Sequence, residues 1–233
     1  MTFSIAARCA RTGMLGIAVS SSSPAVAARC AYARAQVGAV GSQNITDPTL
    51  GPRLLDLMAL GATAPEAVRI VAGTAAHITF RQLLAVDAAG RTGVFSGADT
   101  LGIYAAAEGE GAAAAGNMLK SNAVPERMLS AFVGSTGALG GRLLVAMRAG
   151  LAAGGEEGPV HSSGLLIVRD VSWPVASLRV DWSDADPIAD LERLWALYEP
   201  QLEAYVTRAI DPIRGLLQPS AFRGTSRLQL AVR

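Results

Sequence analysis

The first residues of the chain alternate between apolar and polar side chains, which predicts a β-strand over residues 3–9. Because side chains on a strand point to opposite faces in turn, the hydroxyls of Thr2 and Ser4 share one face. A turn signal and a second alternating run over residues 14–20 predict a hairpin. We therefore expect the end of the second strand, around Ser20-Ser21, to return beside Thr2.

The rest of the chain alternates between groups of strands and groups of helices. Further strands are predicted over residues 37–43, 81–87, 92–96, 104–107, 112–116, 163–172 and 176–181. Helices are predicted over residues 48–60, 63–73, 125–133 and 139–153, and from Asp186-Pro187 to about Leu202. The second of these helices opens with a capping box, Thr63-Ala64-Pro65-Glu66. Segregated strands and helices with antiparallel hairpins favour an α+β fold over a doubly wound parallel sheet.

The helical pattern weakens towards the C-terminus. We therefore predict one domain over residues 1–207 and a C-terminal arm or tail over residues 208–233, irregular after Asp211. An arm of this kind suits packing on a partner subunit, so we expect a homo-oligomer.

Composition supports a globular protein with a substantial core. Hydrophobic residues make up 51% of the 233 residues and charged residues only 17%. The net charge of +1 predicts no binding to nucleic acid or to an anionic membrane surface. Arg8 and Arg11 interrupt any signal-peptide pattern, and no apolar run is long enough to span a membrane. The two cysteines, Cys9 and Cys30, fit free thiols in a reducing cytoplasm.

Thr2 is the strongest candidate for chemistry. Removal of Met1, which is usual before a small residue, would place a threonine at the N-terminus. A free α-amine titrates near ~7.7–8.0, so it can accept the hydroxyl proton, and no histidine partner is required. The alternative is structural, because a strand at the start of a protein with threonine in second position is common.

The other candidate motifs are weaker. His77 and His161 are the only histidines and lack ligand spacing, so no metal site is expected. A Ser-His-Asp triad stays open because geometry defines it, but the sequence has no G-x-S-x-G elbow. Asn117 follows a predicted strand and has a side chain that can donate to a developing oxyanion.

An ordered set of short motifs resembles the family called domain of unknown function 1028. Each motif is weak alone, but their order is specific and extends from residue 1 to about residue 200. The motifs lie at residues 1–8, 12–13, 15–20, 37–40, 42–43, 51–53, 81–82, 86–87, 90, 116–119, 142–144, 149–150, 153–155, 178–181 and 186–188. One departure follows Gly154-Gly155: the family usually has an acidic residue, Arg-Gly and Gln-Ser-Ala, whereas here Glu156-Glu157 opens a different loop up to Ser163.

That family is similar to the N-terminal-nucleophile hydrolases. The resemblance implies a four-layer αββα sandwich of two antiparallel sheets, and amide hydrolysis by Thr2 without a metal or an organic cofactor. We therefore hypothesise a cytoplasmic amidohydrolase that cleaves a small amide or an acylated amino acid. The alternative is a catalytically inactive protein of the same fold that binds a small molecule.

Each candidate site residue has an expected role under the leading hypothesis. Thr2 is the nucleophile and its own amine is the base. Asn117 contacts the oxyanion or the substrate. Ser4 either bonds the amine or is a strand hydroxyl with a purely structural partner, and both alternatives stay open. Ser20 and Gln43 line the substrate pocket.

Overall fold

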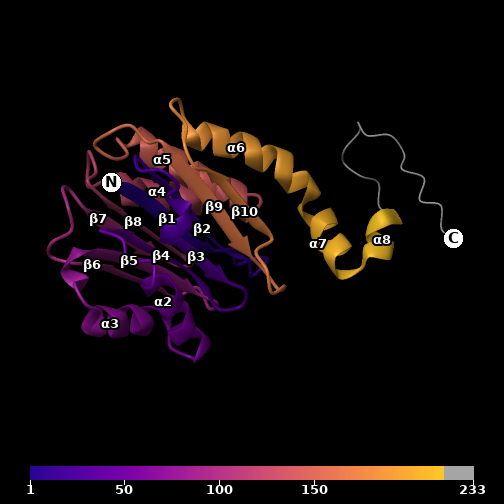
Figure 1. The fold of residues 1–233 in the computed structure, drawn as a ribbon, viewed down its shortest axis with the longest axis horizontal. Coiled ribbons are helices and arrows are strands. Elements are labelled where there is room, and N and C mark those ends of the chain that lie inside the picture. Colours follow the sequence, from indigo (N-terminus) through magenta and orange to yellow (C-terminus); the bar gives the residue numbers. More distant parts are fainter. Residues whose placement is uncertain (218–233) are drawn as a thin grey trace. The chain divides into compact units, whose positions relative to one another are not determined.

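The computed structural model describes residues 1–217, and its main body contains two antiparallel sheets (Figure 1). In spatial order the larger sheet contains β10 (Ala176–Val180), β9 (Ser162–Val168), β2 (Leu15–Ser21), β1 (Thr2–Arg8), β8 (Ala112–Asn117) and β7 (Ala105–Gly109). The smaller sheet contains β3 (Ala31–Arg34), β4 (Gly38–Asn44), β5 (Arg81–Asp87) and β6 (Thr92–Ser96). The N-terminal strand β1 is therefore a central strand of the larger sheet.

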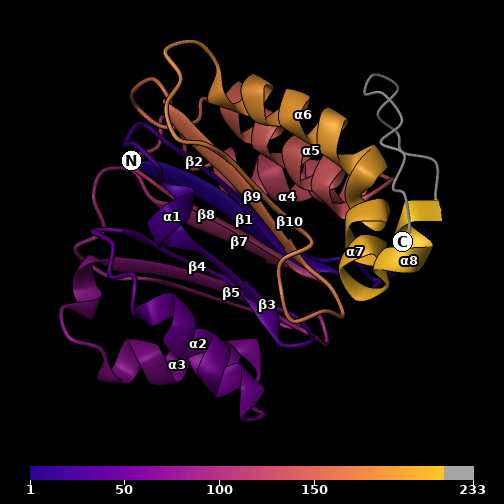
Figure 2. The ribbon, with the colours of Figure 1, turned by 45° about the vertical axis from the view of Figure 1, so that its right-hand side comes forward.

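Helices cover the outer face of each sheet, as Figure 2 shows. The helices on the smaller sheet are α2 (Leu50–Ala59) and α3 (Ala64–Thr74), and those on the larger sheet are α4 (Val124–Gly134) and α5 (Leu139–Ala152). The remaining helices are α1 (Ala27–Cys30), α6 (Pro187–Tyr198), α7 (Leu202–Ile210) and α8 (Pro212–Leu217), with short 3-10 turns at Ile78–Phe80 and Glu199–Gln201. The predicted α+β class and αββα layering are confirmed.

The two faces of β1 bury different groups, as its alternation predicts. Ala6 lies between the sheets, in a cluster with Ile17, Leu84 and small alanines that let the sheets approach. Phe3 lies on the opposite face, towards the helices. A Cβ added to Gly150 of α5 would stand 3.3 Å from the Phe3 ring, so this glycine permits the close packing of helix on sheet.

Most predicted elements are present with small shifts of their ends. The hairpin of β1 and β2 pairs Phe3 with Ser20, and the capping box at Thr63 is confirmed. Two predictions need correction, and two elements, α1 and β3, were not predicted at all. The strand predicted over residues 163–172 ends at Val168. Residues 212–217 are helical where irregular structure was expected, because local helix formation needs no long apolar stripe.

The chain divides into two compact units, Met1–Trp195 and Ala196–Arg233. The predicted boundary near residue 207 and the predicted role of the arm stay predictions, and residues 218–233 of that arm lie outside the described residues.

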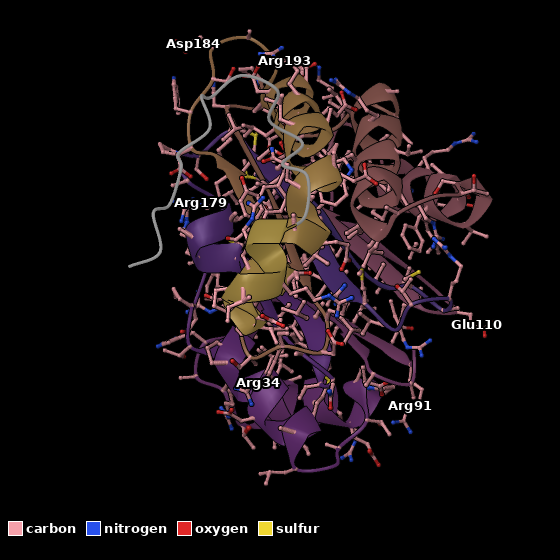
Figure 3. All side chains as sticks on the ribbon, turned by 90° about the vertical axis from the view of Figure 1, so that its right-hand side faces the viewer. Arg34, Arg91, Glu110, Arg179, Asp184 and Arg193 are labelled. Atoms are coloured by element: carbon pink, nitrogen blue, oxygen red, sulfur yellow. The ribbon has the colours of Figure 1, made fainter. Side chains whose placement is uncertain are left out.

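Charged side chains lie mainly on the outside of the fold. The labelled side chains in Figure 3, among them Arg34, Arg91 and Glu110, point away from the ribbon. Both cysteines are free and buried, as expected. In the part of the chain from residue 1 to residue 217, no helix has the length and apolar character that a membrane span requires.

Candidate functional site

Thr2 begins the central strand β1 and is only 5% exposed. It pairs with Asn117 at the end of β8. Residues paired across antiparallel strands share a face, so both side chains lie on the face of the larger sheet that meets the smaller sheet. The N-terminal strand thus places a hydroxyl and a carboxamide together at one end of the interface between the sheets.

The Thr2 hydroxyl lies against the peptide carbonyl that precedes it. Thr2 Oγ1 donates to the Met1 carbonyl oxygen at 2.5 Å, and the buried Ser21 Oγ donates to the same oxygen at 2.5 Å. Thr2 Oγ1 and Ser21 Oγ are 3.4 Å apart. One carbonyl oxygen therefore accepts hydrogen bonds from the candidate nucleophile and from a second hydroxyl, that of Ser21, which is the kind of donor that an oxyanion site provides.

A chain of hydrogen bonds orients the Ser21 hydroxyl. Ser21 Oγ and Ser23 Oγ are 2.8 Å apart, and Arg29 Nη2 donates to Ser23 Oγ at 2.6 Å. A guanidinium can only donate, and the Ser21 proton is already directed at the Met1 carbonyl. Ser23 must therefore donate to Ser21, so that the positive charge of Arg29 polarises the whole chain towards the carbonyl oxygen.

A second buried network of hydrogen bonds joins the two sheets next to Thr2. Ser4 Oγ donates to Gln43 Oε1 at 2.7 Å, and Gln43 Nε2 donates to Gln82 Oε1 at 2.8 Å. Asn117 Nδ2 donates to the same Gln82 oxygen at 3.2 Å. Gln82 Nε2 in turn donates to Ser96 Oγ and to the Gly116 carbonyl, each at 3.0 Å.

This second network determines what Asn117 presents to its surroundings. The bond from Nδ2 to Gln82 orients the carboxamide and leaves Oδ1 buried without a partner. A free acceptor suits an ammonium or an N–H group more than an oxyanion. Asn117 thus lies beside Thr2, a placement that the order of elements along the chain did not predict, while the donors on the nearby carbonyl are the hydroxyls of Thr2 and Ser21.

The other predicted site residues do not all lie on the same face of the sheet as Thr2. Ser4 and Gln43 lie on the Thr2 face, but they bond to each other inside the network. Ser20 pairs with Phe3 and so lies on the opposite face of the sheet, where its hydroxyl donates to the Ser162 carbonyl at 2.9 Å. The structure therefore brings together Thr2, Ser4, Gln43 and Asn117, and separates Ser20 from them.

The loop that departs from the family pattern lies beside the end of β8. Leu119 and Glu156 form an isolated antiparallel bridge, and the Glu157 amide donates to the Met118 carbonyl at 2.8 Å. Met118 has a φ of 49°, a left-handed conformation that turns the chain directly after Asn117. Residues 118–120 thereby hold Glu156 near the N-terminus of the chain.

Glu156 is a buried carboxylate without a good partner. The residue is 1% exposed, and neither side-chain oxygen makes a hydrogen bond of acceptable geometry. Burial raises the pKa of Glu156 from its ordinary 4.5 to about 7. The positive charge of the Met1 amine is the largest influence in the opposite direction, and nearby Ser22 and His161 also favour the charged form and lower this pKa.

A cavity of about 550 Å³ lies next to Glu156. Its lining includes Lys120, Leu151, Glu156, Gly158, Val160 and Asp186. The Met1 side chain reaches the same lining, since a Cβ added to Gly158 would lie 3.1 Å from Met1 Cε. Met1 therefore extends from Thr2, where its carbonyl lies, to the cavity, where its side chain lies.

Three residues of this site were not assigned a role from the sequence: Ser21, Gln82 and Glu156. Two had a usable signal, because the hairpin predicts Ser21 beside Thr2, and pairing β4 with β5 sets Gln82 opposite Gln43. Glu156 had no such signal, since its loop is positioned only by tertiary contacts. Over residues 1–217, no group of three or more His, Cys, Asp or Glu side chains could hold a metal ion.

Comparison with known proteins agrees with the resemblance in the sequence. A family model described as a family of unknown function (DUF1028) matches residues 2–191, which confirms that resemblance. Protein SPO2555 from Silicibacter pomeroyi has a crystal structure similar to this one, with 30% identity and a TM-score of 0.78 over 84% of this chain and 88% of that chain. No curated protein matches the sequence.

More distant similarity is found to structures of Anbu proteins, of which two are described. Anbu (ancestral beta-subunit) from Yersinia bercovieri is 12% identical with a TM-score of 0.41, over 94% of this chain and 100% of that chain. The Anbu (Gly-1) mutant from Hyphomicrobium sp. strain MC1 is 13% identical with a TM-score of 0.41, over 86% and 96% of the two chains.

Proposed function

This chain belongs to the DUF1028 family of unknown function, and we propose that it is an N-terminal-nucleophile amidohydrolase whose nucleophile is the Thr2 hydroxyl. One observation carries the proposal. Thr2 Oγ1 is buried at the start of a central strand, against a carbonyl oxygen that also accepts a hydrogen bond from Ser21. A reacting amide needs these same neighbours, a hydroxyl at its carbonyl and a second donor on its oxygen.

The reaction begins once Met1 has been removed and the Thr2 nitrogen is an amine. The amine takes the hydroxyl proton as Oγ1 attacks the substrate carbonyl carbon, and the carbonyl oxygen becomes an oxyanion. The polarised Ser21 hydroxyl donates to that oxyanion. The C–N bond then breaks, and the leaving amine takes the proton from the Thr2 ammonium, which leaves an ester on Oγ1. Water, deprotonated by the same amine, hydrolyses the ester and releases the carboxylic acid.

The buried network keeps the surrounding groups in place during these steps. Asn117 Oδ1 has no partner in the present arrangement and can accept a hydrogen bond from the Thr2 ammonium. Gln82 orients Asn117, and the bond from Ser4 to Gln43 orients Gln82. We assign Ser4 and Gln43 to positioning, since their polar atoms are engaged with each other.

The test compares Thr2→Ser and Thr2→Ala with the unmodified protein on a panel of small amides and acylated amino acids. Intact-mass spectrometry first establishes that Met1 is absent from all three, since serine and alanine in second position also permit its removal. We expect Thr2→Ser to retain activity and Thr2→Ala to fall to the rate of the blank. Full activity of Thr2→Ala would exclude Thr2 as the nucleophile.

A second candidate function is binding of a small molecule without catalysis. It is favoured by the way Met1 is held, with two hydrogen bonds on its carbonyl and its side chain against Gly158. While Met1 remains, the Thr2 nitrogen is an amide and cannot act as a base. Intact mass of protein purified from cells separates the two functions, since loss of one methionine supports the hydrolase and full retention supports the binding protein.

A further inference from the structure

Met1 occupies the site in the manner of a bound substrate. Its carbonyl oxygen accepts hydrogen bonds from Thr2 and Ser21, and its side chain lies on Gly158 at the cavity. The nitrogen and Oγ1 of Thr2 are attached to adjacent carbons. The acyl group that Met1 places on the nitrogen is therefore close to the position of an acyl group on Oγ1.

We propose that the site hydrolyses amides of α-amino acids that carry a free ammonium group, with the Glu156 carboxylate as the group that binds this ammonium. The inference rests on the proposed function and specifies its substrate class. Ser21 holds the carbonyl oxygen of the substrate, and the side chain extends over Gly158 into the cavity of about 550 Å³.

The state of Glu156 supports this assignment. A carboxylate that is 1% exposed and makes no hydrogen bond of acceptable geometry is costly unless a positive charge lies near it. In the chain that retains Met1, the Met1 ammonium provides such a charge. Removal of Met1 takes this ammonium away, and Glu156 then lines the cavity, ready to accept the ammonium of an incoming amino-acid amide.

The cavity lining fits one amino-acid side chain of variable character. Leu151 and Val160 provide apolar walls, and Lys120 provides a cation. The carboxylate of Asp186 is already bonded to Arg148 at 2.5 Å, whereas neither side-chain oxygen of the buried Glu156 is bonded to a side chain of the described residues. Gly158 has no side chain that would block the path from Thr2 to this space.

The experiment uses full-length protein shown by intact mass to have lost Met1. Release of ammonia is measured from L-methioninamide and from N-acetyl-L-methioninamide, which differ only in the charge of the α-nitrogen. We expect kcat/KM to favour the free amine by ~10-fold or more, and Glu156→Gln to abolish that preference. Glu157→Gln is the matched control, because Glu157 is the adjacent residue of the same lining but is exposed. It should keep the preference.

The outcomes separate this inference from the proposed function. Equal Thr2-dependent turnover of both amides by the unmodified protein would overturn the substrate class and leave the nucleophile intact. This comparison needs no variant, so it holds even where Glu156→Gln fails to fold. An equal loss on both amides in Glu156→Gln would mean that Glu156 serves the Thr2 amine, which also overturns the inference.

A binding measurement covers the case in which the proposed nucleophile is wrong. Thr2→Ala protein without Met1 is titrated with the two amides in a thermal-shift assay. Stabilisation by L-methioninamide alone, lost in the Thr2→Ala/Glu156→Gln double variant, would support recognition of the ammonium without catalysis. Equal stabilisation by both amides, or by neither, would count against it.

Discussion

Replacement of Glu156 by glutamine should change how the stability of the protein depends on pH. Burial raises the pKa of the folded carboxyl from 4.5 to about 7, so the folded state binds this proton more tightly than the unfolded state does. The stabilisation from the protonated carboxyl is complete below the unfolded pKa and is lost as the pH rises through the folded pKa. Glutamine is neutral throughout and shows no such loss.

The size of the effect follows from the two pKa values. A tenfold change in a proton-binding constant corresponds to about 1.4 kcal/mol, so a pKa moved from 4.5 to about 7 corresponds to about 3 kcal/mol. The unmodified protein should therefore lose about 3 kcal/mol relative to Glu156→Gln between about pH 4 and about pH 8.

The assay is urea denaturation of both proteins at several pH values, with the same N-terminus confirmed by mass. Groups that do not interact with residue 156 contribute equally to both proteins and cancel in the difference. Glu157→Gln is the control and should give a difference that is flat with pH, because Glu157 is exposed. A flat difference for Glu156→Gln as well would show that the carboxyl is solvated in the folded protein, and the reasoning about its burial would fail.

Two further substitutions test the networks around Thr2. Ser21→Ala should lower kcat for amide hydrolysis by about 10²–10³-fold with little change in KM, because the donor acts on the developing oxyanion, and steady-state kinetics on protein without Met1 measures this. An unchanged kcat would remove Ser21 from the oxyanion site. Ser4→Ala should lower the free energy of unfolding by about 1–3 kcal/mol, because Gln43 Oε1 would lose its buried donor, and urea denaturation measures this. A change within error would indicate that the bond adds little to stability.

The local alternation of apolar and polar residues was sufficient to predict the first strands of the site and the two faces of β1. The alternation from Thr2 to Ala7 assigned each residue of β1 to a face, and the structure has Phe3 towards the helices and Ser4 between the sheets. This succeeded because side chains alternate strictly along a strand, whatever surrounds it. The same rule applied to the paired strand β2 sets Ser20 on the Phe3 face, away from Thr2. The hairpin predicted that the end of β2 returns near Thr2. The pairing register of β1 and β2, however, determines which face of the sheet the Ser20 side chain lies on.

Segments of the site that are far apart in the sequence come into contact because of how the strands pair and how the two sheets stack. Gln82 bonds to Asn117 because β5 of one sheet faces β8 of the other, and the order of strands along the chain does not specify which strands face each other. Glu156 is buried because its loop lies along residues 118–120.

The amino-acid order was therefore enough to predict most of the elements, the faces of β1 and a candidate nucleophile, Thr2, directly after Met1. The tertiary packing alone decided which polar groups surround Thr2. The physical reason is that periodicity acts between neighbours in the chain, whereas burial, pKa and hydrogen-bond partners depend on residues that only folding brings together.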